Sequence, residues 1–126
     1  MKLTLVVLEE VFAIHRLAVD AVMPVAVFSA EFYSITRSTE ELSIVVPETI
    51  ALESDHVSSN WRALQVLGPL DFALTGILAR LATTLADANI SIFAISTYDT
   101  DYILVKQVSL SAAITVLRNN GYGIVE

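Results

Sequence analysis

Apolar and polar positions along this chain repeat in a single register, sixty residues apart. Residues 31–36 lie over residues 91–96, and further on residues 44–45 lie over residues 104–105. Two earlier segments, residues 6–7 and 12–14, keep the same offset to residues 66–67 and 72–74. Identities are few, but the apolar pattern stays in step without gaps. A duplicated small unit usually places a binding seam between its copies, so the repeat predicts a binding protein.

The second half of the chain has the clearer pattern. Residues 61–67, 90–97, 101–106 and 122–125 are predicted strands, because they are rich in β-branched and aromatic residues bounded by turn signals. Residues 74–88 predict an amphipathic helix, and a second helix is predicted between Ser109 and Asn120-Gly121. The order strand-helix-strand-strand-helix-strand is the split βαβ, ferredoxin-like arrangement.

The first half predicts a degenerate copy of the same unit. Residues 2–8 and 42–46 read as strands, residues 12–18 as a short helix, and residues 25–36 as a β-prone stretch with one break. A polar connector, residues 49–60, stands where the second helix would be. We therefore expect an α+β fold of two ferredoxin-like (βαββαβ) modules in tandem. Residues 1–59 would form the degenerate N-terminal module with its connector, and residues 60–126 the C-terminal module.

Composition adds an argument about assembly. The chain has 126 residues, of which 55% are hydrophobic and only 17% charged. No apolar run approaches the ~20 residues of a membrane helix, and the longest one is cut by Pro24. The apolar excess must be buried in another way, so we expect a homo-oligomer such as a dimer.

Charge excludes other partners. The formal net charge is −7 and the isoelectric point is near 4.6. A duplex phosphate backbone would be repelled, so nucleic acid is not an expected partner. A membrane is not an expected partner either, because no apolar run is long enough to span one. Cysteine is absent, and the first residues lack a secretory cleavage site before Glu9 and Glu10. We expect a cytoplasmic protein without disulfides.

Several motifs together resemble one family. The stretch from Gly68 to Ile77, followed by a helix and Ala88-Asn89-Ile90-Ser91-Ile92, resembles the ACT domain. Residues 92–105 more specifically resemble small bacterial tandem-ACT proteins related to the cytosolic arginine sensors called CASTOR, and residues 12–17, 32–38 and 41–43 match the same proteins. The resemblance implies a non-enzymatic sensor that binds an amino-acid-like ligand at an ACT–ACT interface. We expect no cofactor and no metal.

The resemblance also implies a site. In the arginine sensors a glycine-containing loop at a helix start and a strand-turn segment ending in aspartate hold the ligand. These positions fall here on Leu74, Thr75, Gly76 and Ile77, and on Thr97, Tyr98, Asp99, Thr100 and Asp101. The sensors carry an acidic side chain early in that helix, where this chain has Ala79 and Arg80. Arginine itself is therefore not implied as the ligand.

The residues support two readings of this site. Gly76 would let a ligand carboxylate approach the N–H groups of a helix start, or it would only relieve crowding between helix and sheet. Asp99 and Asp101 would receive an ammonium or guanidinium group, or they would belong to an ordinary solvated turn. Two carboxylates without a nearby histidine are too few for a dedicated metal site.

The matching turn of the first half contains Arg37 and Ser38. Arg37 would hold a ligand carboxylate, or it would be a solvated turn arginine. A nucleophile turn with a histidine partner and a phosphate-binding loop are both missing from the sequence, so catalysis has no support. The alternative to a sensor is a structural or protein-interaction module that kept the fold and lost the ligand.

Overall fold

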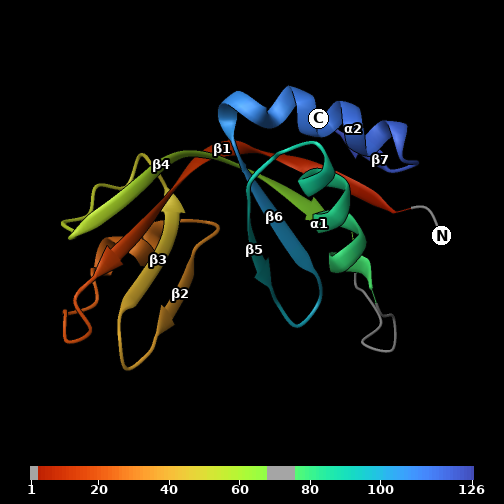
Figure 1. Cartoon of the computed structure of the whole chain (residues 1–126). Helices are drawn as coiled ribbons and strands as arrows, with labels where there is room; N and C mark the ends of the chain where they lie inside the picture. Colours follow the sequence, from red (N-terminus) through yellow and green to blue (C-terminus); the bar gives the residue numbers. More distant parts are fainter. Residues whose placement is uncertain (1–2, 68–75) are drawn as a thin grey trace. The chain divides into compact units, whose positions relative to one another are not determined.

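The computed structural model describes residues 3–67 and 76–126 (Figure 1). Contacts divide the chain into two compact units. Unit 1 contains Met1–Glu9 together with Arg62–Glu126, and unit 2 contains Glu10–Trp61. The elements in chain order are β1 (Thr4–Leu17), the 3-10 helix η1 (Val25–Ser29), β2 (Ser34–Arg37), β3 (Leu42–Pro47), β4 (His56–Val66), α1 (Ile77–Asp87), β5 (Ile92–Ser96), β6 (Asp101–Lys106), the 3-10 turn η2 (Gln107–Ser109), α2 (Leu110–Asn119) and β7 (Gly123–Val125).

Unit 1 confirms the predicted order of the second half, strand-helix-strand-strand-helix-strand. Its strands lie in the order β7-β1-β4-β6-β5. The last strand, β7, pairs in parallel with the start of β1, and Leu5 stands opposite Ile124. The N–H of Gly123 donates to the carbonyl of Leu3 at 2.9 Å. The first residues of the chain therefore complete the sheet of the C-terminal module.

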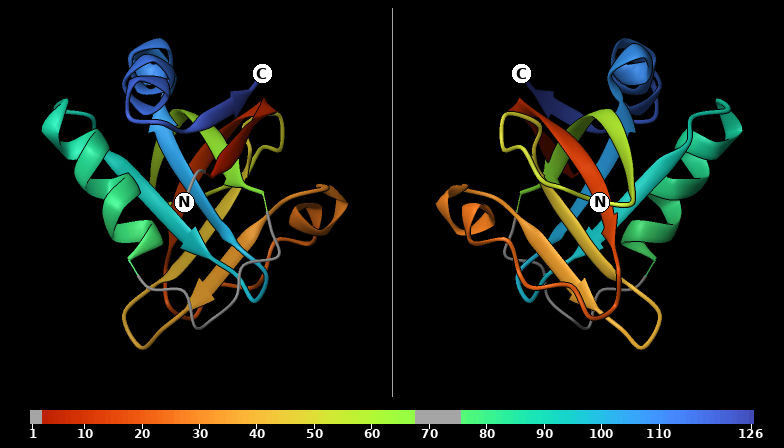
Figure 2. Two further views of the ribbon diagram at one scale, coloured as in Figure 1. Left: turned by 90° about the vertical axis from the view of Figure 1, so that its right-hand side faces the viewer. Right: turned by 90° about the vertical axis from the view of Figure 1, so that its left-hand side faces the viewer.

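Both helices of unit 1 cover one face of these strands (Figures 1 and 2). Most of the apolar side of α1 is buried: Leu81 and Leu85 are fully inaccessible, Ile77 is buried and Leu78 is partly buried, while Ala88 at the end of the helix is exposed. Alternate residues of the strands meet the helices, because successive side chains of a strand point to opposite faces. The core side chains of this face are Leu3, Leu5, Val7, Leu64, Val66, Ile77, Leu81, Leu85, Ile90, Ile103, Val105, Ala113, Ile114, Leu117 and Ile124.

Two residues with positive φ end the helices where the sequence predicts. Asn89 follows α1 with φ 59°, and Gly121 follows α2 with φ 91°. Glycine and asparagine are the residues that adopt this left-handed conformation most readily. Ser109 is the N-cap of α2, but its hydroxyl makes no capping hydrogen bond. The second helix is therefore bounded as expected at its end, while its start lacks the predicted side-chain cap.

The helix predicted over residues 12–18 is wrong, because this segment belongs to the fourteen-residue strand β1. β1 pairs antiparallel with β3, from Phe12 opposite Pro47 to Leu17 opposite Leu42. The alternate residues Ala13, His15 and Leu17 are buried, which is the spacing of a strand. The pairing with β3 decided the conformation of a segment whose own pattern was too short to settle it.

Unit 2 confirms a degenerate first copy that lacks its second helix. Its strands have the order β2-β3-β1-β4, and the only helical element between β1 and β2 in the described residues is η1. The connector predicted over residues 49–60 is shorter than expected, since β4 already starts at His56. The core of unit 2 is formed by Leu17, Val27, Leu42, Ile44 and Val46.

The pairing of β1 with β7 can be tested at Gly123. A Cβ at this position would lie 3.0 Å from Thr4 Oγ1, which is closer than normal van der Waals contact. We expect Gly123→Ala to lower the free energy of unfolding by about 1 kcal/mol, because overfilling a packed site costs on the order of 1–3 kcal/mol. Urea denaturation measures the change.

Thr4→Ala is the matched background for this test, because it removes the oxygen that the new Cβ would meet. Gly123→Ala should cost much less in the Thr4→Ala protein than in the wild type. An equal loss in both backgrounds would show that Thr4 Oγ1 does not hinder a Cβ at residue 123 and would contradict the close approach of the two residues.

A pH effect follows from His15, which is buried in unit 2. Its Nδ1 lies 2.8 Å from Ser54 Oγ, and burial lowers the pKa of His15 below its ordinary value of 6.5. The folded state therefore favours neutral imidazole, and this stabilisation is complete above the unfolded pKa and is lost as the pH falls through the folded pKa. Thermal melts from about pH 7 down to about pH 5 should show destabilisation that is smaller in His15→Asn. His56→Asn is the control for loss of an exposed imidazole.

Candidate functional site

Helix α1 begins at a glycine in the left-handed conformation, which most residues with a side chain adopt only with strain. Gly76 has φ +77° and precedes the first residue of the helix, Ile77. A Cβ at Gly76 would lie 3.3 Å from the guanidinium atom Nη1 of Arg80. The glycine is thus required by its left-handed φ, and what a side chain would meet is Arg80 and not the sheet.

A groove of about 510 Å³ starts at Gly76 and follows the outer side of α1. Such a volume lies in the range of small-molecule sites. The groove is lined by Gly76, Ala79, Arg80, Thr83, Thr84, Asp87, Asn120 and Tyr122. All of these residues belong to unit 1, where α1 lies beside α2 and the residues after it.

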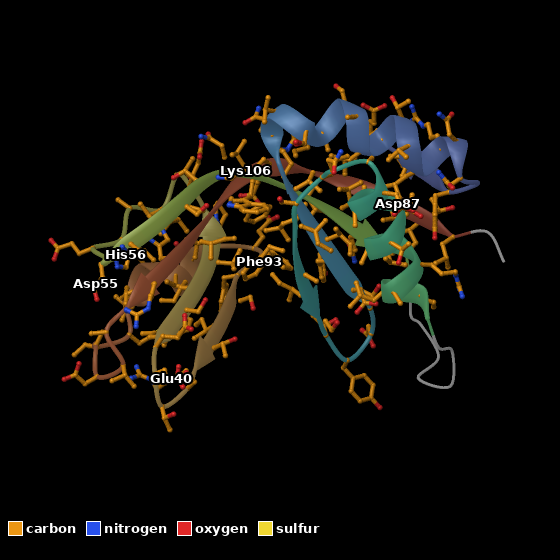
Figure 3. The ribbon with its side chains drawn as sticks, in the orientation of Figure 1. Glu40, Asp55, His56, Asp87, Phe93 and Lys106 are labelled. Atoms are coloured by element: carbon orange, nitrogen blue, oxygen red, sulfur yellow. The ribbon has the colours of Figure 1, made fainter. Side chains whose placement is uncertain are left out.

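The groove has opposite charges towards its two ends. Arg80 and Asp87 are seven residues apart on α1, which corresponds to about 10 Å along the helix axis. Figure 3 labels Asp87 on α1, and Thr83 and Thr84 lie between the two charged residues in the sequence. The hydroxyl of Thr84 already donates to the carbonyl of Arg80 at 2.9 Å. A ligand with separated negative and positive groups fits this charge distribution.

The turn between β5 and β6 is held by its own hydrogen bonds. The N–H of Thr97 donates to the carbonyl of Thr100 at 2.8 Å, and the N–H of Thr100 donates to Thr97 Oγ1 at 3.2 Å. The buried hydroxyl of Thr100 donates to the carbonyl of Val66 at 2.5 Å. Ser96 Oγ donates to Asp101 Oδ1 at 2.6 Å. The polar groups of Thr97 and Thr100 therefore stabilise the turn.

The turn between β2 and β3 has the same construction. The N–H of Ser38 donates to the carbonyl of Glu41 at 2.9 Å, and the N–H of Glu41 donates to Ser38 Oγ at 3.2 Å. Ser38 thus corresponds to Thr97, and the hydroxyl of each closes its hairpin. Arg37, the last residue of β2, corresponds to Ser96, the last residue of β5, so the sixty-residue register predicted from the sequence is wrong by one residue at these turns. Arg37 Nη2 donates to the carbonyl of Ala21 at 2.9 Å, and Nη1 donates to the carbonyl of Val19. Arg37 therefore fastens the segment after β1 within unit 2.

The structure brings only part of the predicted site together. The start of α1, which follows Gly76, and the turn between β5 and β6 lie at the same end of unit 1 (Figures 1 and 2). Ile77 contributes its side chain to the core, and Tyr98 and Asp99 are exposed in the turn. Leu74 and Thr75 lie outside the described residues. Arg37 and Ser38 lie in unit 2, and their contact with a ligand stays a prediction.

Sequence reasoning missed most of the groove. Arg80, Thr83, Thr84 and Asp87 follow Gly76 with the spacing of one helix face, and Asn120 and Tyr122 join them only through the fold. The available signal was the polar side of the amphipathic helix, since residues three and four apart are neighbours on a helix surface. The pattern of the helix predicted its buried apolar side but not the use of its polar side.

One pair in unit 2 has the composition of a nucleophile and a base. His15 Nδ1 and Ser54 Oγ are hydrogen-bonded at 2.8 Å. A triad needs a third group that orients the histidine, and in the described ranges the only side-chain hydrogen bond of His15 is the one to Ser54.

Clusters of three or more metal-binding side chains are absent from the same ranges. No helix among the described residues is long and apolar enough to span a bilayer.

Two family models match the chain. The model described as an ACT domain matches residues 56–119, which is half of the chain. A second model, described as an N-terminal domain, matches residues 10–51. The two matches fall on the two halves of the sequence repeat.

Curated relatives are similar to part of the chain. Human CASTOR3P is 40% identical in an alignment over 88 residues that covers 60% of this chain and 54% of the relative. The human protein named cytosolic arginine sensor for mTORC1 subunit 1 is 38% identical over 65 residues, which are 51% of this chain and 20% of the relative. The chain thus spans about half the length of the first relative and a fifth of the second.

Solved structures are similar over the whole chain. Protein Atu0741 from Agrobacterium tumefaciens has a TM-score of 0.92 and 30% identity, covering 99% of this chain and 93% of its own. The regulatory subunit of aspartate kinase from Thermus thermophilus has a TM-score of 0.63 and 9% identity, covering 91% of this chain and 95% of its own. The second likeness shows the fold alone.

The turn at residues 97–101 generates a stability prediction. We expect Thr100→Val to lower the free energy of unfolding by about 1–3 kcal/mol, because the buried carbonyl of Val66 loses its donor. Thr100→Ser keeps the hydroxyl and should lose less than half as much. Chemical denaturation compares the two variants. A larger loss in Thr100→Ser than in Thr100→Val would show that packing of the methyl group, not the hydrogen bond to Val66, matters most at this position.

Proposed function

This chain belongs to the ACT domain family, and on that premise we propose that it is a non-enzymatic regulatory protein that binds a small amino-acid-like ligand. The curated relatives support a regulatory role, since one of them is named as an arginine sensor. The single observation that carries the ligand proposal is the groove along α1, with Arg80 and Asp87 towards its two ends.

An amino acid has the charge pattern that the groove offers. Its α-carboxylate would pair with the Arg80 guanidinium, which binds carboxylates in a planar, bidentate geometry. An ammonium or guanidinium group of the ligand would pair with Asp87. Gly76 exposes backbone at the start of α1, where the helix dipole favours the same negative group. In this proposal Gly76 and Arg80 bind the ligand carboxylate, and Asp87 binds its cationic group.

The turn of residues 97–101 would have a secondary part in binding. One oxygen of Asp101 accepts from Ser96, and a carboxylate can accept further donors on its other oxygen. Asp99 and Tyr98 are exposed beside it. A second ACT module facing this end of unit 1 would enclose a ligand that the groove alone leaves open to solvent.

Assembly and location extend the proposal. The apolar composition supports a homo-oligomer, because a chain with 55% hydrophobic residues has more apolar surface than one small core buries. A cytoplasmic location is supported by the name of the human relative, a cytosolic sensor.

A second function is favoured by one observation. Four side chains of the predicted site make hydrogen bonds within the protein itself: Arg37, Ser38, Thr97 and Thr100. A module that had lost its ligand and kept its turns would show the same bonds. Such a protein would act by contacts with another protein, independently of any amino acid.

Thermal shift with each of the twenty amino acids tests the ligand proposal. We expect at least one of them to raise the unfolding temperature, because a ligand that binds only the native state stabilises it by about 2.7 kcal/mol at a hundredfold excess over Kd. If none of them does so at millimolar concentration, the sensor is ruled out in favour of the interaction module.

Variants of the groove locate the binding. Arg80→Gln and Asp87→Asn should each raise the Kd for the stabilising amino acid by about tenfold, the loss expected for one charge-assisted contact. Asp101→Asn should weaken it less, and Glu9→Gln, an exposed acid of unit 1 outside the groove, should leave it unchanged. Isothermal titration gives the four Kd values. Weakening by Asp101→Asn alone would move the site to the turn.

A further inference from the structure

The negative charge of this protein is concentrated in unit 2. Unit 2 contains eight acidic residues and two arginines, a formal charge of −6, whereas unit 1 carries −1 of the total −7. The acids of unit 2 are Glu10, Asp20, Glu31, Glu40, Glu41, Glu48, Glu53 and Asp55. A field of this sign attracts basic partners and raises their association rate.

Both arginines of unit 2 are already engaged. Arg37 donates to the carbonyls of Val19 and Ala21. Arg16 Nη2 donates to the carbonyl of Glu40 at 3.2 Å, and its Nη1 lies 3.9 Å from Asp55 Oδ2, at the outer limit of an ion pair. Glu53 takes part in neither of the ion pairs found in the described residues. Its charge is available to a partner.

A pocket of about 300 Å³ in unit 2 combines these acids with apolar walls. Its lining residues are Leu17, Ala18, Ala21, Glu53, Ser54 and Asp55, and we call it the acidic notch. Figure 3 shows Asp55 at the end of unit 2 where β1 ends and β4 begins. Lysine and arginine side chains have an apolar stem and a charged head, which match the walls and the carboxylates of the notch.

Exposed apolar side chains continue from the notch along the segment that follows it. Val22 is 89% exposed, Val25 80% and Phe28 54%. Phe28 also stacks edge to face on Tyr33, with 5.7 Å between ring centroids. We call Val22, Val25, Phe28 and Tyr33 the η1 patch. Its backbone is held in place, because Val27 is fully buried and Arg37 binds the carbonyls of Val19 and Ala21.

We propose that the acidic notch and the η1 patch together dock a basic, apolar segment of another protein. One lysine or arginine of the segment enters the notch between Glu53 and Asp55, and its apolar neighbours cover Val22, Val25 and Phe28. An exposed apolar surface beside uncompensated charge marks a site for a partner of opposite charge.

A second copy of this chain is a poorer occupant of the same surface. In a two-fold symmetric contact the surface would meet itself. Glu53, Asp55 and the other acids of unit 2 would then face like charges, and this repulsion disfavours the contact. The proposal is independent of ligand binding by unit 1, because all of its residues belong to unit 2.

The probe is the acetylated and amidated peptide Leu-Arg-Leu-Phe-Lys, titrated into the full chain by isothermal calorimetry. We expect binding that weakens by about tenfold when glutamine replaces the two basic residues of the peptide, and that falls as salt is raised from about 0.05 M to about 0.5 M. Equal binding of the neutral peptide, or no binding at millimolar concentration, would overturn the proposal.

Protein variants assign the binding to the notch and the patch. Glu53→Gln and Val25→Ser should each lower the affinity for the basic peptide by about tenfold. Glu48→Gln removes the same charge from unit 2 outside the notch and should leave the affinity unchanged. Thermal melts confirm that all three variants are folded. Equal weakening by Glu48→Gln and Glu53→Gln would reduce the effect to net charge and contradict a built site.

Two further outcomes identify other occupants and would also overturn the proposal. N-acetylarginine amide would bind as tightly as the peptide if the notch were a site for a free small molecule. A dimer seen in sedimentation equilibrium that Val25→Ser dissociates would show that the η1 patch faces a second copy.

Discussion

The parallel pairing of β7 with the first residues of β1 determines which parts of the chain fold together. Leu5 stands opposite Ile124, and Gly123 bonds to the carbonyl of Leu3. This pairing adds β7 to the sheet against which α1 and α2 pack. The groove along α1 depends on it, because Asn120 and Tyr122 immediately precede β7. Two residues of the candidate site are thus positioned by a strand from the opposite end of the chain.

Much of unit 1 was predictable from sequence because local signals there agree with one another. The apolar stripe of α1, the positive-φ residues Asn89 and Gly121, and the strand from Asp101 to Lys106 all follow from spacing and turn chemistry. Unit 2 was harder to predict. Residues 12–18 are a strand because β3 pairs with them, and that partner lies some thirty residues further along the chain. The pairing of β1 with β7 joins residues more than a hundred apart, which no local pattern records.

The candidate site shows the same limit. Gly76 was found because glycine at a helix start has a local physical meaning. The sequence places Arg80 and Asp87 on the polar side of the helix, but only the folded structure shows that Tyr122 lines the same groove. The turn hydroxyls suggested by sequence, Ser38 and Thr97, close hairpins in both copies. Charge is also divided unevenly between the two units. Unit 1 carries the groove with Arg80 and Asp87 towards its two ends, and unit 2 carries most of the net negative charge.

Amide hydrogen exchange measured residue by residue tests most directly whether the two ends of the chain form one unit. Cooperative units open together, so amides of one unit share a free energy of opening. The account predicts that the amide of Leu5 in β1 is protected to the same degree as those of Ile114 and Leu117 in α2. A Leu5 amide that exchanges as freely as an exposed terminus, while α2 stays protected, would contradict it.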